Sequence, residues 1–437
     1  MASNREVEMP RLGDGTDALE ITMMGFIGMG SVMMSNFVVE LLHKQGLMGE
    51  KSVKTRFIAE FFSLMLPCLF MFTIFGDHPF WLLGIMICIG LCILLGTGMF
   101  YYHPQTTEDF YNDFRCYLHV ITVIAILGVD FPFFHRRFAK TKALGISPMD
   151  LGTALHVLCM GYGAGLYYKS FRQYSFKKNG LIFLGLSLLG GIKAGFIHFS
   201  GVSYHSEVTE YGVLWNFFIS LAILKLITPI LFPGVFIVAI GISQFFDLYL
   251  DALIVEERNL DIFFDANREG IISLAGYIAL LDLGHIFATI YRKLQGQNPT
   301  TLKGFLAHLL MYIGIYPFYL LALQIGHEPC RRFANPAYVF ICSFFFIGCM
   351  TLFAFMNGMS ERVPKPASLV VAIGRGSIIV FLTGNLLTGL VNITIDTEKV
   401  TDPVISTIIM LVYLFIIAVV GYVLRPAPRA TIAKKQD

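Results

Sequence analysis

The sequence predicts an all-α, polytopic integral membrane protein. Of its 437 residues, 56% are hydrophobic and only 14% are charged, and the mean hydropathy is +0.68. About a quarter of the residues in a soluble globular domain are charged, so roughly half of the usual charge is missing. This composition excludes a water-soluble enzyme, a disordered chain and a basic nucleic-acid binder, and no nucleic-acid partner is expected.

Thirteen apolar windows follow one another along the chain, and each is expected to form one transmembrane helix. A bilayer core of about 30 Å requires about 20 apolar residues per helix. The windows lack the alternation of a β-barrel, and a backbone in lipid must satisfy its own hydrogen bonds. They lie near residues 21–43, 57–76, 79–101, 115–133, 149–168, 180–199, 211–231, 234–254, 270–291, 303–323, 336–357, 368–395 and 403–424.

The windows leave room only for short loops, which fixes the expected organisation. Residues 1–20 form a polar luminal N-terminus, residues 21–424 a single multi-span domain, and residues 425–437 a basic cytosolic tail. An odd number of helices places the termini on opposite sides, and the side rich in Lys and Arg is cytosolic. The side of the tail holds about 18 of these cations against about 11 on the other.

Two lysines near the end of the chain, Lys434 and Lys435, resemble a dilysine retrieval signal. A receptor reads such a signal on the cytosolic face of the endoplasmic reticulum, so it is an address and not an anchor. It agrees with a cytosolic tail, and we expect a multi-pass protein of the endoplasmic reticulum membrane.

The cysteines are expected to be small buried hydrophobic residues. Nearly all lie in apolar windows and none forms a Cys-x-x-Cys pair, so neither a disulfide framework nor a metal site is expected. The eight are Cys68, Cys88, Cys92, Cys116, Cys159, Cys330, Cys342 and Cys349.

The loop over residues 130–142 breaks the charge bias. It places Arg136, Arg137, Lys140 and Lys142 on the side that is otherwise poor in cations. Without this loop, the expected cytosolic side holds about 18 Lys and Arg residues and the other side about 7. Cations kept on the unfavoured side indicate an anion site, and the guanidinium forks suit phosphate. The alternative is a tolerated surface loop.

Asp130 and Lys140 form the candidate catalytic pair of this loop. Asp130 ends an apolar run, so it should lie partly desolvated at the membrane boundary, where a carboxylate becomes a better base. Lys140 follows a turn at Pro132 and could fold back to it. Such a pair could deprotonate an alcohol and stabilise the oxyanion of a tetrahedral intermediate. The alternative is a boundary salt bridge without a catalytic role.

Two further segments join this loop in the candidate site. The first covers residues 190–216 and carries the candidate ligands His198, Glu210, Trp215 and Asn216. The second covers residues 256–269, ends on Asn267-Arg268-Glu269, and carries alternating charges that could bind a hydroxyl-rich head group. The alternative for this end is that Asn267-Arg-Glu269 only caps the next helix.

Charged and strongly polar residues inside the windows are costly and indicate function by default, although pairing between helices is the alternative. An intramembrane histidine, such as His308, is therefore an alternative candidate for the catalytic base. The residues are Lys193, His198, Lys225, Asp247, Asp251, Asp282, His285, His308 and Arg375.

Several short motifs, spread from residue 129 to residue 397, carry a family resemblance. They are Val129-Asp-Phe-Pro with Arg136-Arg-Phe-Ala-Lys140, Met149-Asp-Leu-Gly152, Glu210-Tyr-Gly-Val with Trp215-Asn-Phe-Phe218, Asn267-Arg-Glu-Gly-Ile271 with Ser273-Leu and Gly276-Tyr277, and Asn385-Leu-Leu-Thr-Gly-Leu-Val-Asn392 running into Asp396-Thr397. In these motifs the chain resembles the GPI-anchor inositol acyltransferase family, which includes the fungal protein targeted by anti-GPI antifungals.

The resemblance implies an enzyme of the endoplasmic reticulum with thirteen spans. It would move a palmitoyl-type chain from acyl-CoA to the inositol 2-hydroxyl of glucosaminyl-phosphatidylinositol, with acyl-CoA as co-substrate and neither a cofactor nor an obligatory protein partner. The family's functional aspartate and lysine fall on Asp130 and Lys140. The substrate-binding candidates are Arg136, Arg137, His198, Glu210, Trp215, Asn216, Asn267, Arg268 and Asn385.

The chain also departs from the family pattern. His135 stands where the family more often has proline, Leu214 where it often has histidine, and Ala275 where it has another proline. Leu214 argues against a base at that position and leaves Asp130 as the base. The alternative function is a polytopic lipid or small-solute transporter. Asn392-Ile-Thr394 has the spacing of a glycosylation site but lies within a window, so modification there is not expected.

Overall fold

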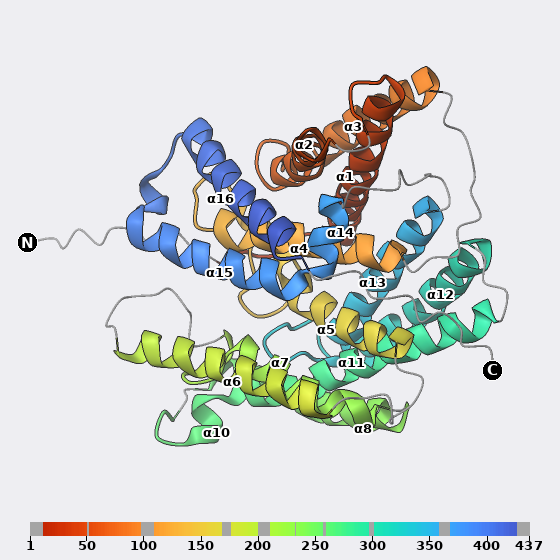
Figure 1. Ribbon diagram of the computed structural model, residues 1–437. Helices are drawn as coiled ribbons and strands as arrows, with labels where there is room; N and C mark the ends of the chain where they lie inside the picture. The colour runs from red at the N-terminus through yellow and green to blue at the C-terminus, as the bar shows by residue number, and fades with distance from the viewer. Residues whose placement is uncertain are drawn as a thin grey trace, which may run out of the picture. The chain divides into compact units, whose positions relative to one another are not determined.

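The structure is a computed structural model, and it describes residues 12–49, 52–97, 109–167, 176–199, 210–231, 233–256, 259–296, 301–357 and 368–425. Helices dominate these residues, and no β-strand occurs among them (Figure 1). An isolated bridge joins Gly13 to Thr141. The all-α prediction is confirmed.

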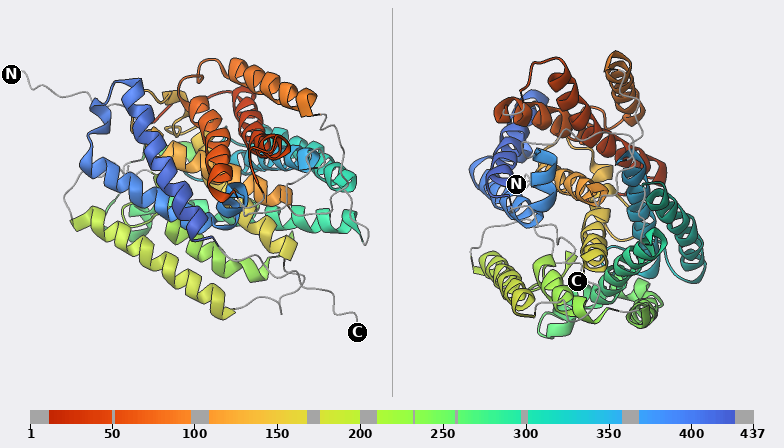
Figure 2. Two further views of the ribbon diagram at one scale, coloured as in Figure 1. Left: turned by 45° about the horizontal axis from the view of Figure 1, so that its top comes forward. Right: turned by 45° about the vertical axis from the view of Figure 1, so that its right-hand side comes forward.

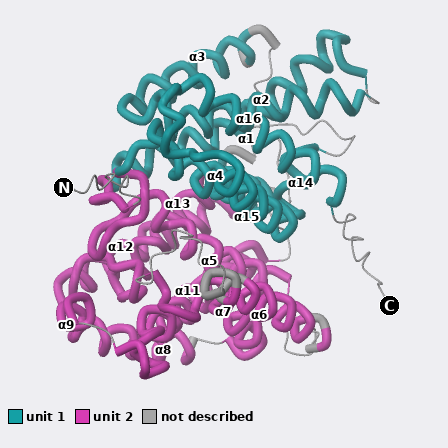
Figure 3. Tube along the Cα trace, turned by 90° about the vertical axis from the view of Figure 1, so that its left-hand side faces the viewer, with its two compact units in different colours: residues 1–11, 18–136, 353–437 teal, residues 12–17, 137–352 magenta. Residues whose placement is uncertain are grey.

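The chain divides into two compact units, coloured separately in Figure 3. Unit 1 contains residues 1–11, 18–136 and 353–437, and unit 2 contains residues 12–17 and 137–352. The prediction that residues 21–424 act as one multi-span domain stays a prediction.

Unit 1 is built from the N-terminal and C-terminal helices of the chain. Helices α1, α2 and α3 pack together, and α4 packs against α14 and α15. The helices of this unit are α1 (Ala18–Lys44), α2 (Val53–Phe72), α3 (Pro79–Thr97), α4 (Asp109–Gly128), α14 (Leu369–Arg375), α15 (Ser377–Thr394) and α16 (Pro403–Val423), with the short 3₁₀ helix η5 (Thr397–Lys399).

Unit 2 is built from the middle of the chain. Helix α11 packs against α5, α7, α8 and α12, and α6 packs against α7. Its helices are α5 (Pro148–Tyr167), α6 (Phe176–Phe199), α7 (Phe217–Ile227), α8 (Pro233–Asp247), α9 (Leu250–Val255), α10 (Phe263–Ala266), α11 (Arg268–Gln295), α12 (Thr301–Ile325) and α13 (Pro336–Asn357, up to Leu352 in this unit). The 3₁₀ helices are η1 (Arg136–Phe138, which begins at the end of unit 1) and η4 (Thr228–Ile230).

Seven helices of the described chain are long and apolar enough to cross a membrane, and several shorter apolar helices accompany them. This finding supports a multi-pass membrane protein. The seven are α1, α2, α11, α12, α13, α15 and α16. The count of thirteen crossings, the luminal N-terminus and the cytosolic C-terminus stay predictions.

The predicted windows locate the helices but miss some of their breaks. The window 368–395 contains two helices, because Gly376 ends α14 and begins α15 with a backbone outside the helical region. Glycine is a poor helix former, which favours the break there. The window 234–254 likewise holds α8 and α9.

Local sequence explains where many helices begin. Five of them start at a proline, which has no N–H to lose at the first helical position; they are α3, α5, α8, α13 and α16. Side-chain caps add to this signal. Ser368 accepts a hydrogen bond from the Val370 amide at the start of α14, and Asp402 accepts from the Val404 amide at the start of α16.

Glycines allow α5 and α11 to approach closely in unit 2 (Figure 1, Figure 2). A Cβ on Gly161 would lie 1.9 Å from the Leu281 carbonyl oxygen, and one on Gly284 would lie 2.3 Å from the Leu158 carbonyl oxygen. Small residues permit this backbone contact between membrane helices. The contact fixes α5 in unit 2, and the first turn of α5 carries Asp150, a central residue of the site described next.

Candidate active site

Asp130 lies in unit 1, on the turn that follows α4. Its side chain is buried, with 4% of the residue exposed, so the predicted desolvation is confirmed. Its amide donates to the Leu127 carbonyl at 3.1 Å. The Asn392 amide nitrogen, from α15, donates to Oδ2 of Asp130 at 2.8 Å. A buried carboxylate with a fixed donor has the orientation that a general base needs.

Arg136 closes the same turn around Asp130. Its Nη1 donates to the Val129 carbonyl at 2.7 Å, and its Nη2 donates to the Phe131 carbonyl. Its guanidinium also lies over the Phe134 ring, 5.8 Å from the centroid. Arg136 therefore shapes the turn that carries Asp130, and its expected contact with an anionic substrate stays a prediction.

Lys140 lies in unit 2 and forms an ion pair with Glu210. The distance from Lys140 Nζ to Glu210 Oε1 is 2.5 Å, and 31% of the lysine side chain is exposed. Arg331 Nη2 lies 3.9 Å from the same Glu210 oxygen. Two cations therefore share one carboxylate.

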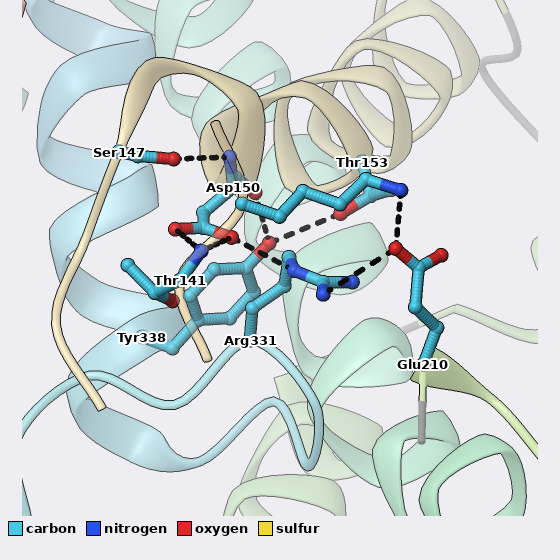
Figure 4. Close-up of polar contacts among 8 residues, drawn as sticks. Thr141, Ser147, Asp150, Thr153, Glu210, Arg331 and Tyr338 are labelled. Atoms are coloured by element: carbon cyan, nitrogen blue, oxygen red, sulfur yellow. Dashed lines mark hydrogen bonds and ion pairs between the residues drawn. The ribbon is translucent and has the colours of Figure 1, made fainter. Parts of the chain in front are cut away.

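Asp150 is the second carboxylate that contacts Arg331. Arg331 Nε donates to its Oδ1 at 2.8 Å, and the backbone amide of Thr141 lies 3.2 Å from each of its carboxylate oxygens. The Tyr338 hydroxyl donates to its backbone carbonyl at 2.6 Å, as Figure 4 shows. The carboxylate is completely buried and fully engaged.

The charge of Arg331 is compensated from two sides. Burial acts to lower the pKa of Arg331, but Glu210 and Asp150 raise it by more, so its pKa lies above the usual range for arginine. Arg331 is therefore a permanent buried cation. Such a charge is tolerated in a protein interior only when it is paired and hydrogen-bonded.

Asn267 organises the segment that follows Glu210. Its Oδ1 accepts from the amides of Leu214 and Trp215 at 2.9 and 3.0 Å, and its Nδ2 donates to the Phe263 carbonyl. It stands at the N-cap position of α11 without making a side-chain cap bond. The Asn267 side chain therefore does not cap α11 but ties the Trp215 loop to the start of this helix.

The other expected ligands have structural partners within one unit. Asn216 caps α7 and also donates to the Gly190 carbonyl at 2.9 Å. Arg268 pairs with Asp265 at 3.1 Å, and Asn385 donates to the Phe381 carbonyl of its own helix. Their substrate contacts stay predictions.

Arg137 and His198 are the two remaining candidate ligands. Arg137 lies over the Phe138 ring, 4.7 Å from its centroid. The side chain of His198, at the end of α6, lies outside the described residues. A role for either in binding substrate stays a prediction.

The catalytic pair of Asp130 and Lys140 also stays a prediction, because Asp130 belongs to unit 1 and Lys140 to unit 2. Within its own unit each residue has a partner from a distant part of the sequence. These partners are Asn392 for Asp130 and Glu210 for Lys140.

His308, the alternative intramembrane base, is fully buried on α12. Its Nδ1 lies 2.7 Å from the Gly304 carbonyl and its Nε2 lies 2.8 Å from the Tyr162 hydroxyl. Both ring nitrogens are thus engaged within the protein, which favours a packing role for this histidine.

Arg331 is the functional candidate that the sequence analysis missed. A signal for it is present, because Arg136-Arg-Phe-Ala139 recurs as Arg331-Arg-Phe-Ala334. In both copies the second arginine lies over the following phenylalanine ring, at 4.7 Å in the first copy and 5.8 Å in the second. The first copy is followed by Lys140, the second by Asn335, whose amide donates to Asp247 at 2.8 Å.

Asp150 and Asn392 belong to the motifs that carry the family resemblance, but the sequence alone predicts no catalytic or binding role for either. Both are hydrogen-bonded to segments far away in the sequence. Among the described residues, no group of three or more His, Cys, Asp or Glu side chains is arranged to hold a metal ion.

These features define a class: a helical, multi-pass membrane protein with buried carboxylates and a buried arginine near the ends of its helices. The chain belongs to the GWT1 family, whose family model matches residues 9–424. Its similarity to the human glucosaminyl-phosphatidylinositol-acyltransferase PIGW is 28% identity, covering 94% of this chain and 95% of the human protein.

The chain is also similar to fungal proteins over most of its length. The GPI-anchored wall transfer protein 1 of Saccharomyces cerevisiae is 29% identical, covering 87% of this chain and 90% of the yeast protein. The protein of the same name from Candida glabrata is 31% identical, covering 72% and 74%. The resemblance found in the motifs is therefore confirmed, and the names of the relatives are those of an acyltransferase and of proteins of GPI anchoring.

Proposed function

We propose that this protein transfers a palmitoyl-type chain from acyl-CoA to the inositol 2-hydroxyl of glucosaminyl-phosphatidylinositol. The observation that carries the proposal is the buried carboxylate of Asp130, held by Asn392 in a chain of the GWT1 family. The human relative is named for acyl transfer to this same glycolipid. No comparable observation favours the alternative of a lipid or solute transporter.

In the proposed reaction Asp130 takes the proton of the inositol hydroxyl as the hydroxyl oxygen attacks the thioester carbonyl. The C–O bond forms, the carbonyl oxygen becomes an oxyanion, and the C–S bond then breaks. The proton held by Asp130 returns to the leaving thiolate, so the products are the inositol ester and CoA. General-base assistance of this kind contributes about 10²- to 10⁴-fold to a rate.

Lys140 is assigned to the developing oxyanion or to the orientation of Asp130. An ammonium group has three donors, and Glu210 engages Lys140 through one carboxylate oxygen. A preorganised cation stabilises an oxyanion best where water is scarce. The apolar helices supply the site for the acyl chain, with about 0.8 kcal/mol for each buried CH₂ group.

The test is a product assay with the purified full chain in lipid nanodiscs, with no other protein added. Labelled palmitoyl-CoA and glucosaminyl-phosphatidylinositol should give a labelled glycolipid together with stoichiometric free CoA. An analogue methylated at the inositol 2-oxygen should give no product. Absence of labelled lipid from the natural acceptor, or equal labelling of the methylated analogue, would contradict the proposal.

We also propose that the protein resides in the endoplasmic reticulum membrane. The support is the dilysine pair Lys434 and Lys435, which lies outside the described residues. Replacing both lysines with serine should move a tagged chain to later compartments in cells. Unchanged retention would show that this pair is not the address.

A further inference from the structure

Lys140 is one member of a closed ring of charges in unit 2. Starting from its ammonium group, the ring passes to Glu210 at 2.5 Å, to Arg331 at 3.9 Å and to Asp150 at 2.8 Å. It closes through the backbone amide of Thr141, the residue next to Lys140, which lies 3.2 Å from both oxygens of Asp150. Figure 4 shows the contacts of Asp150 with Thr141 and Arg331, and that of Arg331 with Glu210.

The ring holds Lys140 at both ends of the residue. Glu210 engages the ammonium group, and Asp150 engages the adjoining backbone. The backbone carbonyl of Lys140 also accepts from the Gly13 amide at 2.8 Å. A flexible lysine side chain loses substantial rotamer entropy when it is fixed, so fixing it in advance lowers the cost of using it in a reaction.

Arg331 joins Glu210, the partner of the Lys140 ammonium group, to Asp150, the partner of the adjoining backbone. Its Nε faces Asp150 and its Nη2 faces Glu210, an arrangement that only a planar fork with several donors provides. Two carboxylates and two cations also balance the charge of the ring. Without Arg331, Asp150 and Glu210 would lose the cation that they share, and the Lys140–Glu210 pair would lose its side-chain link to Asp150.

Asp150 is itself fixed by neighbouring residues. Its amide lies 3.2 Å from the Ser147 hydroxyl, and its carbonyl accepts from Tyr338. The Tyr338 hydroxyl is in turn 3.1 Å from the Thr153 hydroxyl. Asp150 is therefore held by residues of α5 and α13.

We infer that Arg331 and Asp150 are positioning residues that set the place of the Lys140 ammonium group through Glu210. The inference rests on the proposed role of Lys140 in acyl transfer. It adds to that role two residues that do not themselves touch the reacting atoms.

The first test compares Arg331→Gln with Arg332→Gln in the product assay. Arg332 is the adjacent arginine, and it forms a similar buried ion pair with Glu269 at 2.9 Å outside the ring. Arg331→Gln should lower kcat by about 10- to 100-fold, as expected for a misplaced catalytic group, and leave KM for acyl-CoA within about twofold. Arg331→Lys, which keeps the charge but loses the fork, should recover part of kcat.

Arg332→Gln should lower thermal stability by a similar amount while keeping most of kcat. Equal losses of kcat in the two glutamine variants would overturn the inference. So would an Arg331→Gln variant with kcat within about twofold of the wild type. If Arg331→Gln does not yield folded protein, the comparison is made with Arg331→Lys and Arg332→Lys.

The second test asks whether Arg331 acts through Glu210. In a Glu210→Gln background, Arg331→Gln should cause little further loss of kcat, because residues that act as a unit are not additive. Independent, multiplying losses would overturn the inference.

The third measurement needs no enzymatic activity. The rate at which an amine-reactive reagent labels Lys140, followed by peptide mass spectrometry, should rise in Arg331→Gln and not in Arg332→Gln. If the wild type fails to transfer acyl groups, the proposed function fails, and the labelling rates still decide the positioning role. Unchanged labelling in Arg331→Gln would overturn it.

Discussion

The side-chain amide of Asn392 donates a 2.8 Å hydrogen bond to the carboxylate of Asp130, which ties α15 to the turn that follows α4. The two residues are 262 positions apart in the sequence. The bond leaves Asp130 buried but oriented, which a catalytic carboxylate requires. It also uses the nitrogen that a glycan would need, in agreement with the expectation that Asn392 is not glycosylated.

Removal of this donor should impair the reaction more than the fold. Asn392→Ala should lower kcat by about tenfold, since a buried hydrogen bond to a charged group contributes about 1.5–3 kcal/mol. The measurement is kcat in the product assay. Thr394→Ala is the matched control, because it removes the same glycosylation spacing and Thr394 bonds only within α15. Equal activity of Asn392→Ala and the control would contradict the prediction.

Lys140→Met should cost kcat more than affinity for acyl-CoA. The reason is that an ammonium group aimed at a developing oxyanion acts in the transition state and adds little to ground-state binding. Steady-state kinetics with varied palmitoyl-CoA separate the two quantities. A raised KM with unchanged kcat would assign the lysine to substrate binding instead.

His308→Ala should keep acyl transfer and lose stability. The substitution empties a fully buried position and removes one hydrogen-bond partner of the Tyr162 hydroxyl, at a cost of about 2 kcal/mol or more. Thermal unfolding followed by size-exclusion chromatography measures the loss, and the product assay measures the activity. An inactive variant with wild-type stability would instead support an intramembrane histidine mechanism.

Cys330 should resist alkylation at neutral pH. Burial raises the pKa of its thiol from 9.0 to about 11. The thiolate is the reactive form, so an increase of about two pKa units reduces its fraction near pH 7 by about 100-fold. Because the pKa is raised, reactivity should increase only as the pH approaches 11.

Isotope-coded maleimide and peptide mass spectrometry give the labelling rate of Cys330. The detergent-denatured chain is the control, in which Cys330 should react at the rate of an ordinary thiol. Rapid labelling of the native protein at pH 7 would contradict the burial of this residue.

Much of the helical architecture could be predicted from the sequence, because hydropathy and helix-start signals are local. Each apolar window contains a helix, and prolines mark several helix starts. The burial of Asp130 followed from its place at the end of an apolar run. The break at Gly376 was missed because one glycine barely changes the hydropathy of a window.

The partners of the candidate residues could not be predicted, because they come from distant segments. Glu210 is 70 positions from Lys140, and Asp150 is 181 positions from Arg331. Composition and spacing carry no information about such pairs. The repeat of Arg-Arg-Phe-Ala was a usable signal for Arg331, since the first copy precedes the candidate lysine.

The central claim is that the Asp130 carboxylate activates the acceptor hydroxyl. Its most direct test is the single-turnover rate of palmitoyl transfer by Asp130→Asn, which keeps the size of the side chain and removes its basicity. The account predicts a fall of at least about 10²-fold with unchanged thermal stability and unchanged binding of palmitoyl-CoA. A folded Asp130→Asn protein with a near-normal rate of transfer would contradict it.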